Sequence, residues 1–151
     1  MESNPDLANK LQTVLHHEIP LSRDIGIRVV TYEQTSLNLQ APLANNINHK
    51  QTAFGGSLYS VAVLSGWGLL YLLLEERGIH AHIVIHESQV KYHKPVQGDI
   101  VARASLLAAA DLERMVKLFH RSGMARINLY AEIRFDDELA MEFHGQYVVH
   151  R

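Results

Sequence analysis

The feature that most constrains this chain is the absence of any charged side chain between Lys50 and Glu75. The stretch opens with the pair Gly55-Gly56 and continues with mainly apolar residues. A segment this apolar predicts a helix that is buried on every side, rather than an amphipathic surface helix. The N-terminus of such a helix points free backbone N–H groups at the polar loop before it. That arrangement suits a ligand on which negative charge develops.

A transmembrane span is the alternative for the same stretch, because about 18 uncharged residues are enough to suggest one. Its glycine and serine residues dilute the hydrophobicity, and strand-like segments that need a covering helix follow it directly. We therefore favour a core helix and expect no membrane partner. Residues 1–6 are polar and predict no secretion signal.

Composition and charge exclude several classes of protein. With 47% hydrophobic and 20% charged residues, the 151-residue chain has the balance of one globular domain, residues 1–151, in which 1–18 form a helical lead-in. A formal net charge of −2 gives no global attraction to nucleic acid, so no such partner is expected. The chain has no cysteine. This excludes a disulfide framework and a thiolate nucleophile, and it fits a cytoplasmic location.

Hydrophobic spacing predicts the remaining elements. Helices are expected at residues 7–17 and 111–120, and strands at 25–30, 37–41, 82–94 and 100–107. The clearest strands are 127–135 and 139–149, in which apolar residues alternate and which Asp136-Asp137-Glu138 joins as a hairpin. These elements predict an α+β fold, in which an antiparallel sheet of five or six strands wraps around one long buried helix.

The order of strand pair, polar loop, Gly-Gly helix and a strand ending in Tyr92-His93-Lys94-Pro95-Val96-Gln97-Gly98-Asp99 resembles a hot-dog domain of the acyl-thioesterase and dehydratase superfamily. Within it, residues 45–56 and the later Ser65-Gly66-Trp67-Gly68 resemble the thioesterase-like domain that proteobacteria carry alone or fused behind an N-acetyltransferase domain. That family includes malonyl-acyl-carrier-protein decarboxylases. The resemblance covers residues 19–151.

The chain also departs from ordinary hot-dog thioesterases. Many of those have His-Gly-Gly at the helix start and a carboxylate about two turns on, whereas Phe54 and Val63 occupy these places here. Hydrolysis needs an activated water. Decarboxylation of a malonyl thioester needs a desolvated site and hydrogen-bond donors for the enolate oxygen. The resemblance therefore implies conversion of malonyl-acyl carrier protein to acetyl-acyl carrier protein, supporting the start of fatty acid synthesis, with no cofactor.

The resemblance also assigns the site residues. The loop asparagine of the family falls on Asn45, which is expected to be the catalytic donor to the thioester oxygen or the malonyl carboxylate. If the alignment of this loop to the family is shifted, Asn46 or Asn48 takes the role instead of Asn45. The structural alternatives are that Asn45 caps a turn in the loop, and that Gly55 and Gly56 serve only close helix–sheet packing. The other residues expected to bind substrate are Asn46, His49, Lys50, Phe54, Gly55, Gly56 and Ser57. Ser57 is also expected to cap the N-terminus of the helix.

Two further groups of residues invite a functional interpretation. Four basic residues form either a solvated helix face or a surface for an acidic carrier protein: Arg114, Lys117, Arg121 and Arg126. His80, His82 and His86 share one face if the strand reaches back to His80. Strand neighbours two residues apart lie about 6 to 7 Å from each other, which is poor chelation geometry, so no metal site is expected.

Two other functions remain open: a thioesterase for acyl-CoA or acyl-carrier substrates, and a non-catalytic acyl-binding or dimerisation module. The expected partners are acyl carrier protein or a coenzyme A thioester, together with further copies of this chain. A homodimer or a dimer of dimers is expected, because hot-dog domains resemble half of a larger sheet and the free edge of a short sheet tends to pair.

Overall fold

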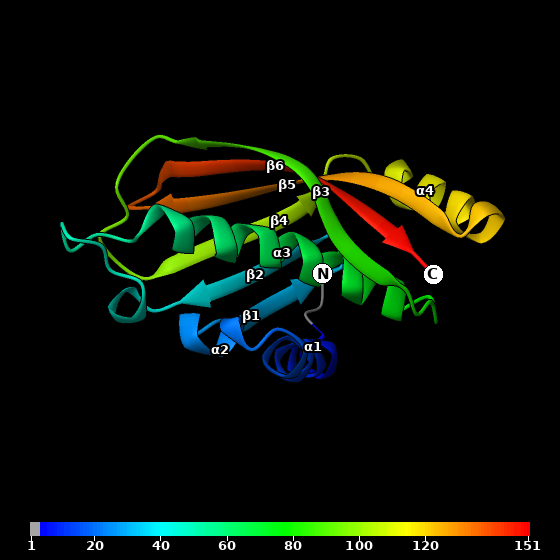
Figure 1. The fold of residues 1–151 in the computed structure, drawn as a ribbon, viewed down its shortest axis with the longest axis horizontal. Helices are drawn as coiled ribbons and strands as arrows, with labels where there is room; N and C mark the ends of the chain where they lie inside the picture. The colour runs from blue at the N-terminus through cyan, green and yellow to red at the C-terminus, as the bar shows by residue number, and fades with distance from the viewer. Residues whose placement is uncertain (1–3) are drawn as a thin grey trace.

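A computed structural model describes residues 4–151. Six antiparallel strands form one sheet in the order β1-β2-β4-β5-β6-β3, and this sheet curves around the long helix α3 (Figure 1). The predicted architecture is therefore confirmed, with six strands. The elements are α1 Pro5–Glu18, α2 Leu21–Ile25, β1 Arg28–Glu33, β2 Ser36–Ala41, the 3-10 turn η1 Leu43–Asn45, α3 Gly55–Glu75, β3 His82–Tyr92, β4 Ile100–Leu106, α4 Ala109–Ser122, β5 Met124–Phe135 and β6 Glu138–His150.

The first strand begins later than predicted. The strand expected at residues 25–30 starts at Arg28, because Leu21–Ile25 forms the short helix α2. Gly26 ends that helix in the left-handed conformation, with a φ of 80° that a residue with a side chain rarely adopts. Ile25 and Ile27 are both buried. Their spacing matches a strand although they belong to a helix end and the turn after it.

Helix α3 is the core helix of the fold. Its length and composition would allow it to cross a membrane, but 67% of an 18-residue apolar stretch of this helix is buried inside the protein. The prediction of burial on every side needs one correction, because one stripe of residues at i, i+4 spacing is only half-buried. Part of this stripe lies beside β3, since the Trp67 indole N–H donates to the Ile83 carbonyl at 3.0 Å and the Tyr59 hydroxyl bonds to Ser88 at 2.7 Å. Its members are Gly55, Tyr59, Val63, Trp67, Tyr71 and Glu75.

Strand β3 is a free edge of the sheet. It is 11 residues long, and within residues 4–151 it pairs with β6 alone. Its apolar residues Val84 and Tyr92 are about half exposed, at 48% and 53%. A long edge strand with apolar side chains and an unpaired outer side is a surface on which another chain can pair. The half-buried stripe of α3 and the β3 edge thus lie on one incompletely covered side of the protein.

The hairpin between β5 and β6 forms as predicted. Its two strands pair from Met124 and His150 to Phe135 and Glu138, and both are longer than the sequence pattern indicated. Asp136 and Asp137 have φ angles of 51° and 60°. Positive φ at both central residues is the signature of a type I′ turn, whose twist matches that of the paired strands.

Candidate active site

The N-terminus of α3 presents backbone donors to the preceding loop. The helix has Phe54 as its N-cap residue, and no side chain caps it. The N–H groups of Ser57 and Leu58 donate to the Phe54 carbonyl at 2.9 and 3.0 Å. Within residues 4–151, no hydrogen bond uses the N–H groups of Gly55 or Gly56. These two donors and the positive end of the helix dipole therefore face outward, where they can stabilise an anionic oxygen.

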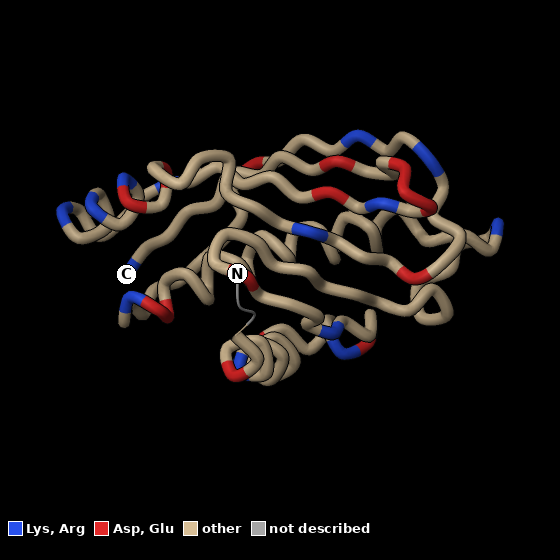
Figure 2. The backbone as a smooth tube through the Cα atoms, turned by 180° about the vertical axis from the view of Figure 1, so that it is seen from behind, with Lys and Arg blue, Asp and Glu red and all other residues tan. Residues whose placement is uncertain are grey.

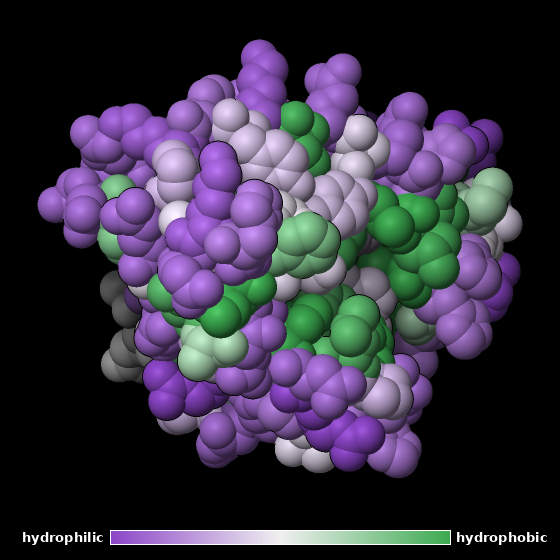
Figure 3. All heavy atoms as spheres, turned by 60° about the vertical axis from the view of Figure 1, so that its left-hand side comes forward, coloured by the Kyte–Doolittle hydropathy of each residue, from purple (hydrophilic) through white to green (hydrophobic). Residues whose placement is uncertain are grey.

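Ser57 does not cap this helix, contrary to the prediction. It lies inside the first turn, three residues after the N-cap residue Phe54. The Phe54 side chain is 56% exposed, and its ring lies over Gly56, where an added Cβ would come within 2.4 Å of the ring. Glycine at this position therefore leaves room for the phenyl ring beside the free N–H groups. Figure 3, in which this end of the molecule comes forward, shows apolar surface among polar groups.

Asn46 has a structural role in the loop before α3. Its side chain is 4% exposed, and its amide nitrogen donates to the carbonyls of Ile25 at 2.9 Å and Pro42 at 2.7 Å. Both amide hydrogens are thus used within the protein. The backbone carbonyl of Asn46 accepts the Phe54 N–H at 2.7 Å. Asn46 joins the end of α2 to the start of α3, which leaves it unsuited to donate to a substrate.

Asn45 is exposed at the end of η1. Its amide nitrogen donates to the Asp24 carbonyl at 3.2 Å and would lie 2.9 Å from a Cβ added to Gly26. The amide therefore points toward α2. No hydrogen bond within the described residues uses its side-chain oxygen. The structure places Asn45 next to Asn46 in the loop but shows no contact between its side chain and Gly55 or Gly56.

Asn48 organises the tip of the same loop. Its side-chain oxygen accepts the N–H groups of Lys50 at 2.9 Å and Thr52 at 3.1 Å, and its amide nitrogen donates to the Thr52 hydroxyl. His49 and Lys50 are exposed, and neither forms an ion pair within the described part of the chain. The loop tip therefore carries a free cation that can attract an anionic substrate.

Tyr92 is a site residue for which the sequence analysis assigned no role. Its hydroxyl donates to the Gly55 carbonyl at 2.9 Å, which ties the end of β3 to the first residue of α3. Burial raises the pKa of this hydroxyl, so it stays protonated as a donor. The sequence feature that could have indicated this role is the position of Tyr92 at the start of the Tyr92-to-Asp99 segment. A strand that ends beside the N-terminus of α3 brings its last side chain close to that N-terminus.

Helix α3 carries no carboxylate near these donors. Its first acidic residue, Glu75, is the last residue of this 21-residue helix, about 30 Å from Gly55 along the helix axis. A hydrogen bond from Lys10 holds the pKa of the Glu75 carboxyl below its usual value. Val63, at the place where thioesterases have a carboxylate, is half-buried, and its backbone carbonyl accepts the Tyr147 hydroxyl at 2.6 Å.

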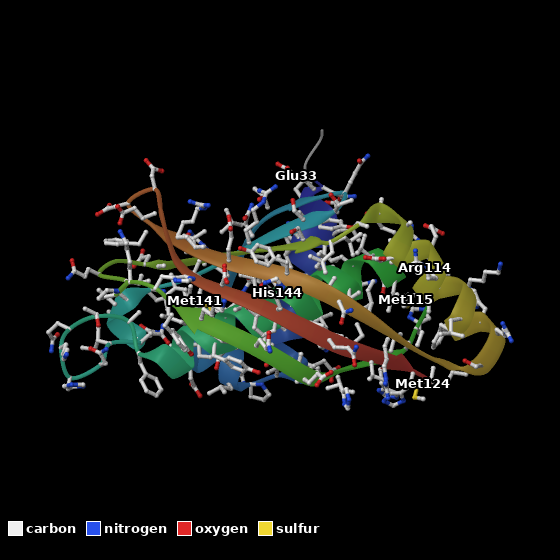
Figure 4. The ribbon with its side chains drawn as sticks, turned by 90° about the horizontal axis from the view of Figure 1, so that it is seen from above. Glu33, Arg114, Met115, Met124, Met141 and His144 are labelled. Carbon is white, nitrogen blue, oxygen red and sulfur yellow. The ribbon has the colours of Figure 1, made fainter. Side chains whose placement is uncertain are left out.

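The four basic residues lie far from the α3 N-terminus of the same chain. Arg114, Lys117 and Arg121 are exposed on α4, and Arg126 is exposed on β5. Arg114 pairs with Asp111 at 3.0 Å. Figure 2 shows the cations along α4 at one end of the molecule, and Figure 4 places Arg114 at the end opposite the loop before α3. One chain therefore does not bring its basic surface and its helix N-terminus together.

The predicted face shared by His80, His82 and His86 does not form. His80 precedes β3, and a register shift between Ile85 and Glu87 displaces His86. His82 instead pairs with His150 on the adjacent strand β6, with ring centroids 5.2 Å apart. Among the described residues, no group of three or more histidine, cysteine or acidic side chains is arranged to hold a metal ion.

A curved antiparallel sheet around one long helix defines a protein of the hot-dog class. Residues 8–151 match the family described as "Putative thioesterase (yiiD_Cterm)". The chain belongs to this family.

Solved structures agree with this assignment. A protein of unknown function from Chlorobaculum tepidum TLS is 35% identical, with a TM-score of 0.94 over 99% of this chain and 97% of that one. A protein from Shewanella oneidensis described as a putative thioesterase is 27% identical, with a TM-score of 0.85 over 98% of this chain and 100% of that one. A thioesterase from Haemophilus influenzae, at 15% identity and a TM-score of 0.72 over 95% and 90% of the two chains, shares the fold.

Proposed function

We propose that this protein decarboxylates a malonyl group carried as a thioester on acyl carrier protein, and so supplies acetyl-acyl carrier protein for the start of fatty acid synthesis. One observation carries the proposal. The N-terminus of α3 offers the free N–H groups of Gly55 and Gly56, while the helix has no carboxylate before Glu75. Such a site can stabilise an anion but has no base on this helix to activate water.

The chemistry follows from these groups. The bond between the malonyl carboxylate and its α-carbon breaks, CO2 leaves, and the electron pair passes into the thioester carbonyl as an enolate. The N–H groups of Gly55 and Gly56 and the helix dipole stabilise the enolate oxygen. A proton from water then adds to the α-carbon and gives the acetyl thioester. A carboxylate at Val63 would repel the malonyl group, so its absence suits this reaction.

Asn45 is the proposed side-chain donor. Its amide would release the Asp24 carbonyl, to which it donates at 3.2 Å, and turn to the malonyl carboxylate or the thioester oxygen. Because a single exposed hydrogen bond contributes only about 1 kcal/mol, exchanging it for a bond to a charged group is favourable. Lys50 at the loop tip supplies a cation that favours the approach of the malonyl carboxylate.

A homodimer completes the proposed assembly. Two β3 edges that pair antiparallel would cover the half-buried stripe of α3 and the exposed Val84. The two-fold axis would also reverse the neighbouring chain. The α3 N-terminus of one chain would then lie toward the α4 end of the other, so that a carrier bound to α4 could serve the partner's site.

We expect light scattering at micromolar concentration to give two or four times the mass of one chain. Val84→Lys places a charge on the β3 edge and should shift the protein toward monomer. The matched control is Val101→Lys, because Val101 is 40% exposed on β4, away from this edge. A wild-type protein that is a stable monomer at this concentration would exclude the assembly.

Charge reversal on α4 should weaken use of the carrier. In the Lys117→Glu, Arg121→Glu double variant, we expect the KM for malonyl-acyl carrier protein to rise about 10-fold at low ionic strength and to depend less on salt. The matched control reverses Arg28 and Arg103, which are exposed on β1 and β4, away from both α4 and the β3 edge. If both double variants change KM equally, or neither does, α4 is an ordinary solvated face.

A thioesterase is the second candidate, favoured by the family description and by the description of the Shewanella oneidensis protein. Mass spectrometry separates the candidates. The protein is incubated with malonyl and acyl thioesters of both acyl carrier protein and coenzyme A. Acetyl thioester with CO2 supports the decarboxylase, and free acid with free thiol supports the thioesterase. No change on any substrate would leave the acyl-binding module as the best account.

A further inference from the structure

Three tyrosine side chains connect the first half of α3 to the strands beside it. The Tyr92 hydroxyl donates to the Gly55 carbonyl at 2.9 Å. The hydroxyls of Tyr59 and Ser88 share a hydrogen bond at 2.7 Å. The Tyr147 hydroxyl donates to the Val63 carbonyl at 2.6 Å. Each of the three rings thus spans the space between α3 and strand β3 or β6, and a hydrogen bond to its hydroxyl fixes the end of the side chain.

The space between α3 and these strands is closely packed. Tyr59 meets Phe143 edge-on, with ring centroids 5.8 Å apart. Phe143 and Tyr147 are fully buried. A Cβ added to Gly66 would lie 2.3 Å from the Tyr147 hydroxyl oxygen, and one added to Gly145 would lie 2.6 Å from the Phe143 ring. Glycines next to both rings, Gly66 on α3 and Gly145 on the same strand as Phe143, show that the aromatic side chains fill the available volume.

Tyr59 is the next of the three tyrosines along α3 after Tyr92, whose ring lies beside Gly55 itself. It follows Gly55 by one helical turn on the same half-buried stripe, about 6 Å along the helix axis. An acyl tail that enters between α3 and β3 from Gly55 would meet the Tyr59 ring after about four or five carbons, at a C–C bond length of about 1.5 Å. A longer tail has to displace a ring that Ser88 and Phe143 hold in place.

We propose that Tyr59, backed by Phe143 and Tyr147, is a specificity-determining residue that limits the acyl group to about four carbons. The inference rests on the proposed function only in placing the thioester at the α3 N-terminus. It adds a steric selection for short acyl groups, malonyl and acetyl among them, over the long acyl chains of completed fatty acids.

The test measures binding, so that it does not depend on turnover. The probes are ketone analogues of acetyl-, butyryl-, hexanoyl- and octanoyl-pantetheine, in which a CH2 group replaces the thioester sulfur. For the wild-type protein, isothermal titration calorimetry should show at least about 10-fold weaker binding of the octanoyl than of the butyryl analogue. In Tyr59→Ala, this preference should fall to about 3-fold or less through tighter binding of the octanoyl analogue.

Two further variants control for packing and for folding. Tyr59→Phe keeps the ring and removes the bond to Ser88, so it should retain most of the length preference. If Tyr59→Ala proves unstable, Tyr59→Leu replaces it in the test, because leucine fills more of the space than alanine. Tyr59→Leu should bind the hexanoyl analogue. Equal binding of all lengths by the wild-type protein would overturn the inference, as would an unchanged preference in folded Tyr59→Ala and Tyr59→Leu.

The outcomes for the two proposals are distinguishable. A length preference that Tyr59→Ala abolishes, in a protein that does not decarboxylate malonyl thioesters, would retain the inference and remove the decarboxylase. Malonyl turnover without any length preference in binding would do the reverse. If no analogue binds to the wild-type protein, the α3 N-terminus is not an acyl site and the inference fails.

Discussion

Replacing Asn45 with alanine is expected to lower the turnover of a malonyl thioester by about 100- to 1000-fold, the usual cost of removing one donor from an oxyanion-type site. The variant removes the amide and leaves the backbone of the loop intact. Steady-state kinetics with malonyl-acyl carrier protein measures the change, and it should appear mainly in kcat if the donor acts on the enolate. Asn45→Asp keeps the size of the side chain but replaces the amide with a carboxylate, so it should lose at least as much activity.

The structure supplies the control for this experiment. The Asn45 amide also donates to the Asp24 carbonyl, so a purely structural role predicts a loss of stability of about 1 kcal/mol with little effect on kcat. Asn48→Ala serves as the matched variant, because Asn48 organises the same loop through three hydrogen bonds. Near-normal turnover by folded Asn45→Ala would rule out the assignment. Loss of a hydrolase activity present in the parent would instead favour the thioesterase.

Gly66→Ala should destabilise the protein by about 2 kcal/mol or more. The new methyl group would lie 2.3 Å from the Tyr147 hydroxyl oxygen and 2.7 Å from the ring carbon that bears it. Tyr147 is fully buried and cannot move into solvent. Overpacking of this kind costs about 1 to 3 kcal/mol or more, and the gain in helix propensity of at most about 1 kcal/mol offsets only part of it. Urea denaturation measures the loss.

A double variant tests the cause of that loss. Tyr147→Phe removes the closest atom but also the hydrogen bond to Val63, so alone it should cost about 1 kcal/mol. Combined with Gly66→Ala, it should cost less than the sum of the two, because the clash is partly relieved. Gly55→Ala is the matched control, since a Cβ there makes ordinary contacts of 3.6 to 3.8 Å with Tyr92. Unchanged stability of Gly66→Ala would mean that the Tyr147 ring can shift.

Much of the fold was predictable because burial leaves a local pattern in the sequence. The alternation in β5 and β6 follows the two faces of a pleated strand, and the uncharged stretch of α3 follows its place in the core. The predicted start of β1 was wrong because the buried Ile25 and Ile27 have the same spacing as strand residues. Local spacing does not show that a glycine between them turns the chain.

The candidate site was only partly predictable, because hydrogen bonds to distant segments decide what a polar side chain can do. Asn45 and Asn46 are adjacent and identical in type, yet Asn46 is buried with both amide hydrogens used and Asn45 is exposed. The roles of Tyr59 and Tyr92 depend on β3 lying beside α3. No local pattern contains that contact.

The sequence by itself determined the six strands and the three longer helices, the core helix among them, and the absence of a carboxylate near the start of that helix. Composition and periodicity express these properties directly. Only the tertiary structure decided the strand order, the free β3 edge, the separation of the α4 cations from the α3 N-terminus and the closure of the space between α3 and β3. These features depend on contacts between residues far apart in the chain. Such contacts are selected by the packing of the whole protein, and the spacing of residues within one segment carries no record of them.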